Sequence, residues 1–144
     1  MSTINEIRRR IASLDISDAA ATAIDQSRNV IVKQQHDQLL HGLRADGKKI
    51  GRYKNKAYAA KKAAMNPLPG FGFMDWKLTG QLHKDIFIDV RKETFVLDSA
   101  DSKTGGLISR FNDPFGLTLE GRKVVINARL RADFVRNIKA KLWA

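Results

Sequence analysis

The chain contains no cysteine. This absence excludes a disulfide framework, thiolate-ligated metal sites and thiol redox or cysteine-nucleophile chemistry, and it is typical of proteins assembled in a reducing cytosol. Long apolar runs are also missing, because no stretch approaches the roughly 18 apolar residues that cross a bilayer. Residues 1–6 lack the apolar segment of a signal peptide. The sequence therefore predicts a soluble, unprocessed protein with no membrane partner.

Acidic residues are few relative to basic ones. The chain has 26 lysines and arginines against 15 aspartates and glutamates, a net charge of +11, which favours anionic partners such as nucleic acid or acidic protein surfaces. The excess lies in two segments: residues 42–74 carry eight basic side chains and one acidic, and residues 121–144 carry seven and one. With 144 residues, of which 43% are hydrophobic, the chain is predicted to form one domain with a modest core.

The first 41 residues have helical periodicity. A short amphipathic helix is predicted from an apolar stripe at three- and four-residue steps (Ile4, Ile7, Ile11 and Leu14). Asp15 to Asp18 supply a stop and a new N-cap, and a second helix is predicted to reach His41. Its narrow apolar stripe is rich in alanine (Ala20, Ala23, Ile24, Ser27 and Ile31). Such a stripe suits packing against another copy of the chain.

Residues 78–144 combine strand and helix patterns. Alternation in Ile86–Val90, followed by Phe95–Leu97, predicts a hairpin over Ile86 to Ser99. A short helix is predicted over Lys103 to Phe111, ending before Pro114. A long C-terminal helix is predicted from Thr118, with an apolar stripe at Ile126, Leu130, Phe134, Ile138 and Leu142. The predicted fold class is α+β: a long N-terminal helix and a C-terminal helix packed on a small antiparallel sheet.

The segment between these parts, residues 42–77, is strongly basic and is interrupted at short intervals by glycine and proline. Only Tyr58 to Met65 has a helical pattern. We interpret the segment as an extended arm or long loop that is mobile in the free chain and ordered on binding, because it has few apolar residues. The predicted organisation is N-terminal helices (1–41), basic arm (42–77) and core (78–144), all in one domain.

The three histidines are the first candidates for metal ligation or general-base catalysis. His36 and His41 are five residues apart, so they do not share a helix face as a four-residue pair does. His83 stands near Asp85, but no nucleophile motif or second histidine accompanies it. The sequence therefore predicts no catalytic and no metal-binding residue.

Motifs for cofactors are also missing. Gly70-Phe71-Gly72 and Gly105-Gly106 lack the strand–turn–helix setting and the lysine–serine pair of a nucleotide cradle, and are better explained as turns. The sequence thus predicts a non-enzyme without a cofactor or a small-molecule substrate.

Two sets of residues are predicted to contact a partner. The basic arm places two tyrosines among its cations (Lys48, Lys49, Arg52, Tyr53, Lys54, Lys56, Tyr58, Lys61 and Lys62). This pattern is typical of single-strand nucleic-acid binders, and equally of an arm that docks on acidic neighbours with the tyrosines as buried anchors. An aromatic cluster follows (Phe71, Phe73 and Trp76). It marks either a contact surface or a segment that caps the protein's own core.

One stretch resembles a known family. Leu78-Thr79-Gly80-Gln81-Leu82-His83-Lys84-Asp85-Ile86 is similar to the Thr-Gly-x-Leu-x-x-x-Ile box of the phage virion-morphogenesis and tail-completion proteins, which include minor tail and head–tail joining components. The family-like positions are Leu78, Thr79, Gly80, Leu82 and Ile86. The family's later order is also similar: hairpin, short helix, a loop with a phenylalanine (Phe115-Gly116-Leu117), and a final helix. The likeness covers about half the chain.

Another part of the sequence resembles a variant of this family. Residues 46–53, 58–59 and 66–72 are similar to the form found in phages of gut Bacteroides-type hosts, including crAss-like phages. One departure is Asp113-Pro114-Phe115-Gly116, where the family often has an Ala-Arg-Pro-Phe-like segment.

The resemblance implies a virion structural protein of a tailed phage, assembled in the host cytoplasm. It would be a neck or tail component (head–tail connector, tail completion or terminator ring subunit) around the DNA conduit. Its partners would be further copies of itself in a ring and portal or tail subunits, with possible non-specific DNA contact. The alternative is a stand-alone nucleic-acid-binding protein that uses residues 42–63.

Overall fold

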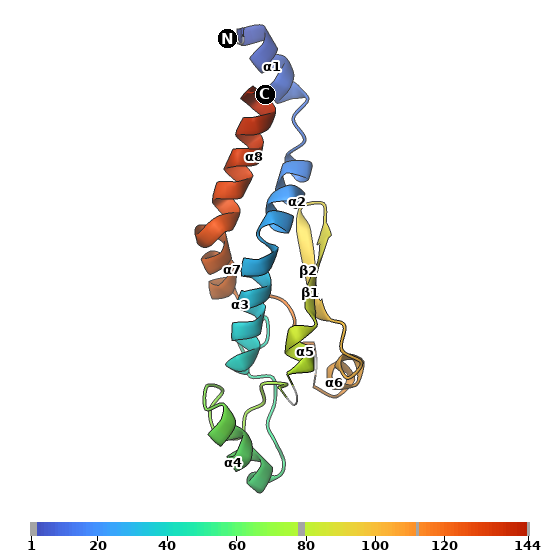
Figure 1. Cartoon of the computed structure of the whole chain (residues 1–144), viewed down its shortest axis with the longest axis vertical. Coiled ribbons are helices and arrows are strands. Elements are labelled where there is room, and N and C mark those ends of the chain that lie inside the picture. Colours follow the sequence, from blue (N-terminus) through green and yellow to red (C-terminus); the bar gives the residue numbers. More distant parts are fainter. Residues whose placement is uncertain (1–2, 78–79, 112, 144) are drawn as a thin grey trace.

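The computed structural model describes residues 3–77, 80–111 and 113–143. The molecule is elongated, with helices aligned along its long axis and a hairpin beside them (Figure 1). The predicted α+β class is confirmed, since helices and a two-stranded antiparallel sheet make up most of the chain. None of the helices in the described ranges is long and apolar enough to cross a bilayer.

The N-terminal helices are close to the prediction, with one break. α1 spans Ile4–Ala12 and begins at a capping box, in which the backbone N–H of Glu6 donates to Thr3 Oγ1 and the N–H of Thr3 donates to Glu6 Oε2. The predicted single helix to His41 is two helices, α2 (Ile16–Gln26) and α3 (Arg28–Leu40). Ser27 separates these two helices. Its hydroxyl donates to Asp133 Oδ2, on the C-terminal helix, at 3.3 Å.

The alanine stripe of α2 is covered within the chain. Ala20 is partly buried and the other stripe residues, Ala23, Ile24, Ser27 and Ile31, are buried; α8 (Arg131–Trp143) runs antiparallel to α2 along this face (Figure 1). Small side chains allow the two helix axes to approach closely. The prediction that this stripe packs against another copy is therefore wrong, because the chain's own C-terminal helix occupies it.

The C-terminal helix is continuous but differs from the prediction in its buried face. α7 (Leu119–Val125) passes through a π-helical turn, Ile126–Leu130, into α8. The buried side chains are Val125 and Asp133, whereas none of the five predicted stripe residues is fully buried. An i→i+5 turn inserts one extra residue and rotates the following face away from a strict four-residue spacing.

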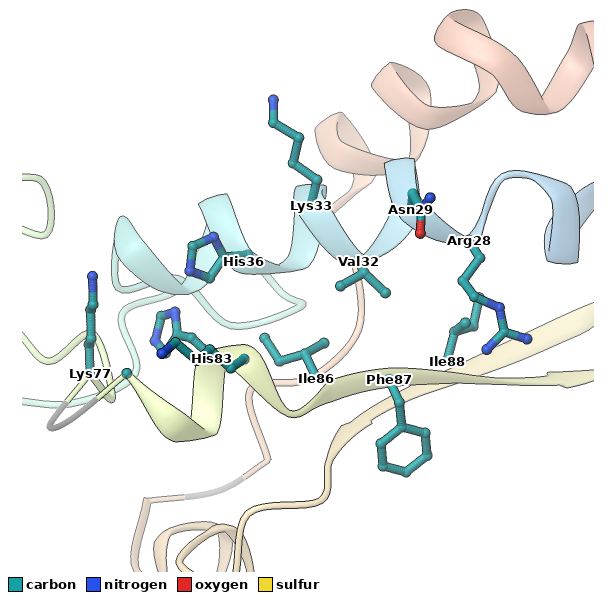
Figure 2. Close-up of a pocket in the computed structure, with 12 residues that line it drawn as sticks. Arg28, Asn29, Val32, Lys33, His36, Lys77, His83, Ile86, Phe87 and Ile88 are labelled. Atoms are coloured by element: carbon teal, nitrogen blue, oxygen red, sulfur yellow. The ribbon is translucent and has the colours of Figure 1, made fainter.

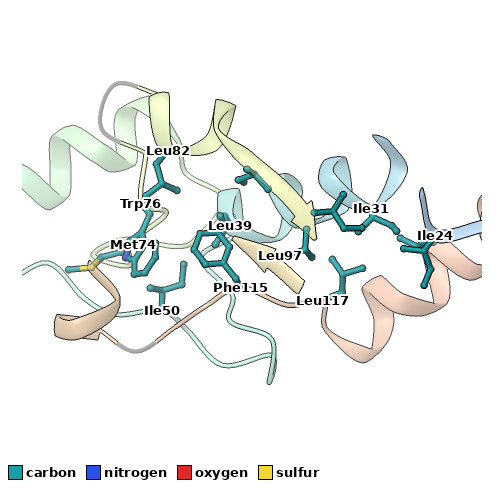
Figure 3. Close-up of a cluster of buried hydrophobic side chains, with 13 residues drawn as sticks. Ile24, Ile31, Leu39, Ile50, Met74, Trp76, Leu82, Leu97, Phe115 and Leu117 are labelled. Atoms are coloured by element: carbon teal, nitrogen blue, oxygen red, sulfur yellow. The ribbon is translucent and has the colours of Figure 1, made fainter. Parts of the chain in front are cut away.

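The hairpin pairs β1 (Ile86–Arg91) with β2 (Thr94–Ser99), as the sequence predicts. It follows α5 (Gln81–Lys84) and precedes α6 (Thr104–Phe111). Its inward side chains join the core between α2–α3 and the loop 113–118 (Figure 3). The core comprises Ile24, Ile31, Leu39, Ile50, Met74, Trp76, Leu82, Ile86, Ile88, Leu97, Phe115, Leu117 and Val125.

The loop that carries Phe115 is fixed by two buried glutamines of α3. The N–H of Gly116 donates to Gln35 Oε1 and its carbonyl accepts from Gln38 Nε2, both at 2.8 Å. The side chain of Phe115 then meets Trp76, with the ring centroids 6.1 Å apart. Residue 115 is therefore a core residue.

The predicted basic arm is folded. Isolated bridges join Leu43 to Lys49 and Arg52 to Phe73, and α4 (Lys56–Met65) forms the end of the molecule opposite the two termini (Figure 1). Gly42 has φ +71°, and a Cβ there would lie 2.6 Å from the carbonyl oxygen of Met74. Such close chain crossings require a packed segment, so the prediction of an extended arm is wrong, whereas ordering on binding stays a prediction. The contacts that the sequence did not predict join residues 40–50 to residues 66–77.

Candidate interaction surface

We call residues 42–77 the α4 end, because they form one terminus of the long molecule. α4 begins at Asn55, whose Oδ1 accepts from the N–H of Tyr58 at 3.0 Å. Several large apolar side chains of this end are exposed: Tyr58 (36%), Met65 (65%), Leu68 (53%) and Phe71 (63%). We call these four residues the apolar patch. Large apolar side chains exposed on one segment make that segment a candidate contact surface.

Cations accompany the apolar patch. Lys48, Lys54, Lys56 and Lys61 are exposed, and none of the four forms an ion pair with a described residue. Unpaired cations beside exposed apolar side chains favour a partner that is both acidic and apolar.

Two further cations of this end have structural contacts. The guanidinium of Arg52 lies 4.4 Å from the centroid of the Phe73 ring, and Lys49 Nζ lies 5.0 Å from it. Lys49 Nζ also donates to the carbonyl of Pro69 at 2.6 Å. These contacts hold residues 49–52 against residues 69–73, so Phe73 stabilises the α4 end and is partly buried.

Beneath this surface lies a buried ion pair. Lys62 Nζ is 3.0 Å from Asp75 Oδ1, with side-chain exposures of 9% and 2%. Asp75 also accepts from Asn66 Nδ2 and from the backbone N–H of Lys77, both at 2.9 Å. Desolvation alone raises the pKa of Asp75, but these three donors outweigh it and hold the pKa below its usual value. The ion pair therefore joins α4 to Asp75, which stands between the core residues Met74 and Trp76.

Tyr53 packs beside this ion pair, near Asp75. Its ring meets that of Tyr58 edge to face, with centroids 5.1 Å apart. Burial, followed by the nearby charge of Asp75, raises the pKa of the Tyr53 phenol well above its usual value. Tyr53 therefore keeps its proton and acts as a packing residue.

His83 lies next to this cluster, against α3. Its Nε2 is 2.8 Å from the carbonyl oxygen of Asp75, which only accepts, so Nε2 carries the proton. Its ring meets that of His36 edge to face, with centroids 4.8 Å apart. Burial lowers the pKa of His83, and the proximity of His36 lowers it further, against the opposing effect of the Asp75 hydrogen bond. The ring is neutral at pH 7.

This lowered pKa makes stability depend on pH. The unfolded chain binds a proton at residue 83 more readily than the folded chain, so the stabilisation is complete above about pH 6.5 and is lost as the pH falls through the folded pKa. We expect the free energy of unfolding, measured by urea titration, to fall between pH 7 and pH 5. His83→Gln keeps a donor without a titrating ring, so it should flatten this decrease. An equal decrease in both proteins would contradict the assignment.

The structure divides the predicted contact residues into exposed ones, two partly buried ones (Tyr53 and Phe73) and two interior ones. The exposed predicted contact residues are Lys48, Lys49, Arg52, Lys54, Lys56, Tyr58, Lys61 and Phe71. Trp76 is 5% exposed and packs in the core, which corrects its prediction as a contact residue in favour of the core-capping alternative. Lys62 is likewise buried, by its pairing with Asp75. Neither side chain is available to a partner.

The family-like box lies at the start of α5. Leu78 and Thr79 are outside the described residues. Gly80 has φ +87°, which favours glycine, and precedes α5 directly. Leu82 and Ile86 are buried in the core. These described positions of the box therefore have structural roles.

Sequence reasoning missed Met65 and Leu68, which belong to the apolar patch, and the cluster of Asn66, Asp75 and His83. Met65 ends a helix and Leu68 stands between two prolines, so local periodicity carried no signal for their exposure. The polar cluster joins residues that lie eight or nine positions apart on separate segments, where no helix or strand periodicity relates them. In the described ranges, no three histidine or acidic residues come together as a metal site would require.

Further apolar side chains are exposed along the helices. Leu119 (59%), Val124 (51%) and Val135 (43%) lie on α7 and α8, and Ile4 (70%) and Ile11 (55%) lie on α1. α1 has no buried residue and is tied to the end of α8 by a hydrogen bond from Arg10 Nη1 to the carbonyl of Leu142 at 2.8 Å. The surfaces of α1 and of α7–α8 therefore offer apolar contact area in addition to the α4 end.

No family model, curated protein or solved structure matches the chain.

Proposed function

We propose that this protein is a structural component of a tailed-phage virion, a neck or tail subunit that works by assembling with further copies of itself and with portal or tail proteins. Its action is mechanical joining rather than catalysis. The proposal combines the family-like box at residues 78–86 with the distribution of exposed apolar and basic side chains.

The observation that carries the proposal is the apolar patch at the α4 end. Phe71, Leu68 and Met65 are each more than half exposed on a segment that is itself firmly packed. A rigid segment that presents large apolar side chains loses little conformational entropy on binding, which favours a permanent protein contact. The surrounding lysines select an acidic neighbour.

The other exposed apolar side chains suit a repeated assembly. The patch lies at one end of the molecule, whereas α1 lies at the other and α7–α8 lie along one side (Figure 1). Different patches on one chain produce heterologous contacts between identical copies, and such contacts close into rings when the rotation permits. A ring around a DNA conduit is the geometry that we propose.

The alternative function, stand-alone nucleic-acid binding, rests on the same lysines. If Lys48, Lys54, Lys56 and Lys61 neutralise phosphates, a log–log plot of duplex affinity against salt has a slope of about −0.9 for each contact. We expect weak binding to a 20-base-pair duplex at physiological salt, measured by fluorescence anisotropy. Tight binding with a slope steeper than about −3, lost when the four lysines are changed to glutamine, would support the alternative instead.

A further inference from the structure

The hairpin has an open edge on β1. The backbone N–H of Ala100 donates to the carbonyl of Asp85 at 3.0 Å, so residues 85 and 100 form a hydrogen-bonded pair. Hydrogen-bonded and non-hydrogen-bonded pairs alternate along an antiparallel ladder. With this register, the N–H and C=O groups of Ile86, Ile88 and Val90 therefore point away from β2. In the described part of the chain, no group hydrogen-bonds to these outward N–H and C=O groups.

A groove lies beside this edge. It has a volume of about 760 Å³ and runs between α3 and the segment formed by α5 and β1 (Figure 2). Ile86 and Ile88 point toward α3, whereas Phe87 points to the opposite face of the hairpin (Figure 2). Val32 of α3 adds to the apolar wall. An extended chain placed here would have a free strand edge on one side and apolar side chains on the other.

The charges around the groove have one sign. Its basic lining residues are Arg28, Lys33, Lys77 and Lys84, and no carboxylate lines it. Arg28 and Lys33 each have an acidic neighbour on α2 or α3, at 2.5 and 3.9 Å. Lys77 and Lys84 form no ion pair with any residue that the structure describes. The groove therefore favours an occupant with negative charge.

We propose that the groove binds an extended, acidic peptide segment of a partner protein, which adds to β1 as a third strand. Its main chain would bond to the outward groups of Ile86, Ile88 and Val90, and its acidic side chains would meet Lys77 and Lys84. The unpaired groups of an open strand edge are a template for pairing with another chain, and a partner strand would cover this edge. The inference does not depend on the virion assignment, since it rests on the hairpin and groove and not on the α4 end.

The test uses the full chain and a fluorescein-labelled peptide of alternating aspartate and valine, eight residues long. We expect the peptide to bind and to slow hydrogen exchange at the amides of Ile86, Ile88 and Val90. The same peptide with alternate backbone nitrogens methylated should not bind, because it cannot complete the ladder. A lysine–valine peptide of the same length should not bind either, because its charge is wrong for the groove.

Matched variants locate the site. Lys77→Gln with Lys84→Gln should weaken peptide binding about tenfold, as expected for two exposed charge contacts. Lys92→Gln with Lys103→Gln removes the same charge outside the groove and should leave binding unchanged. Absence of binding, binding of the methylated peptide, or binding without protection of the three amides would overturn the proposal. Displacement of the peptide by a DNA duplex at lower concentration would identify a nucleic-acid site and would overturn it too.

Discussion

Lys62→Met is expected to lower the free energy of unfolding by about 3–5 kcal/mol, the cost of leaving one member of a buried ion pair without its partner. The carboxylate of Asp75 is 2% exposed, so water cannot replace the ammonium group 3.0 Å away. The two remaining donors, from Asn66 and Lys77, satisfy part of the carboxylate, which places the loss near the lower limit of that range. The loss is measured by urea unfolding at pH 7.

Lys61→Met is the matched control. Lys61 is the preceding residue of α4, is exposed and has no ion pair with a described residue, so the same change there should cost less than about 0.5 kcal/mol. A double-mutant cycle with Asp75→Asn should give a coupling energy of about 1–3 kcal/mol. Equal losses for Lys62→Met and Lys61→Met would contradict the packing of α4 onto the core.

Removing the apolar patch is expected to have the largest effect on assembly. Phe71→Ala combined with Leu68→Ala removes two side chains that are 63% and 53% exposed, so folding stability should change little. If the patch anchors a neighbouring subunit, the dissociation constant of the assembly should rise at least about 30-fold, because aromatic and large apolar anchors dominate interface energies. Sedimentation velocity over a range of concentrations measures this change.

Two comparisons make this experiment specific. Val96→Ala removes an exposed apolar side chain from β2, outside both the apolar patch and the groove beside β1, and should leave assembly unchanged. Changing Lys48, Lys54, Lys56 and Lys61 to glutamine should weaken assembly less than about tenfold, because exposed charges contribute little each. Assembly that survives loss of the patch but fails on loss of the lysines would mean that charge, not apolar contact, holds the subunits.

Local sequence patterns predicted most of the secondary structure. The stripe from Ile4, the alternation from Ile86 to Val90 and the pattern after Thr118 each placed an element where the structure has one. The break at Ser27 was not predictable from its neighbours, because its hydroxyl pairs with Asp133, 106 residues later in the chain. The π-helical turn before that aspartate likewise leaves no signal in a four-residue periodicity.

The α4 end shows why the rest was missed. Its composition is basic and rich in glycine, which indicated an arm, but its fold depends on contacts between distant residues. Asn66 donates to the carbonyl of Leu40 at 2.9 Å, and Lys62 pairs with Asp75. Part of the exposed candidate surface, including Phe71 and Lys48 but not Met65 or Leu68, was identifiable from charge and aromatic content alone. The burial of Trp76 required knowledge of Phe115, which lies 39 positions away.

The mass of the purified chain in solution tests the central claim most directly. Native mass spectrometry and light scattering, on the chain alone and with a candidate portal protein, should show a closed oligomer with one defined copy number or a stoichiometric complex with portal. Loss of the apolar patch should dissociate that species. A monomer at every concentration, with no portal complex and no presence in purified virions, would contradict the proposed role as an assembling virion subunit.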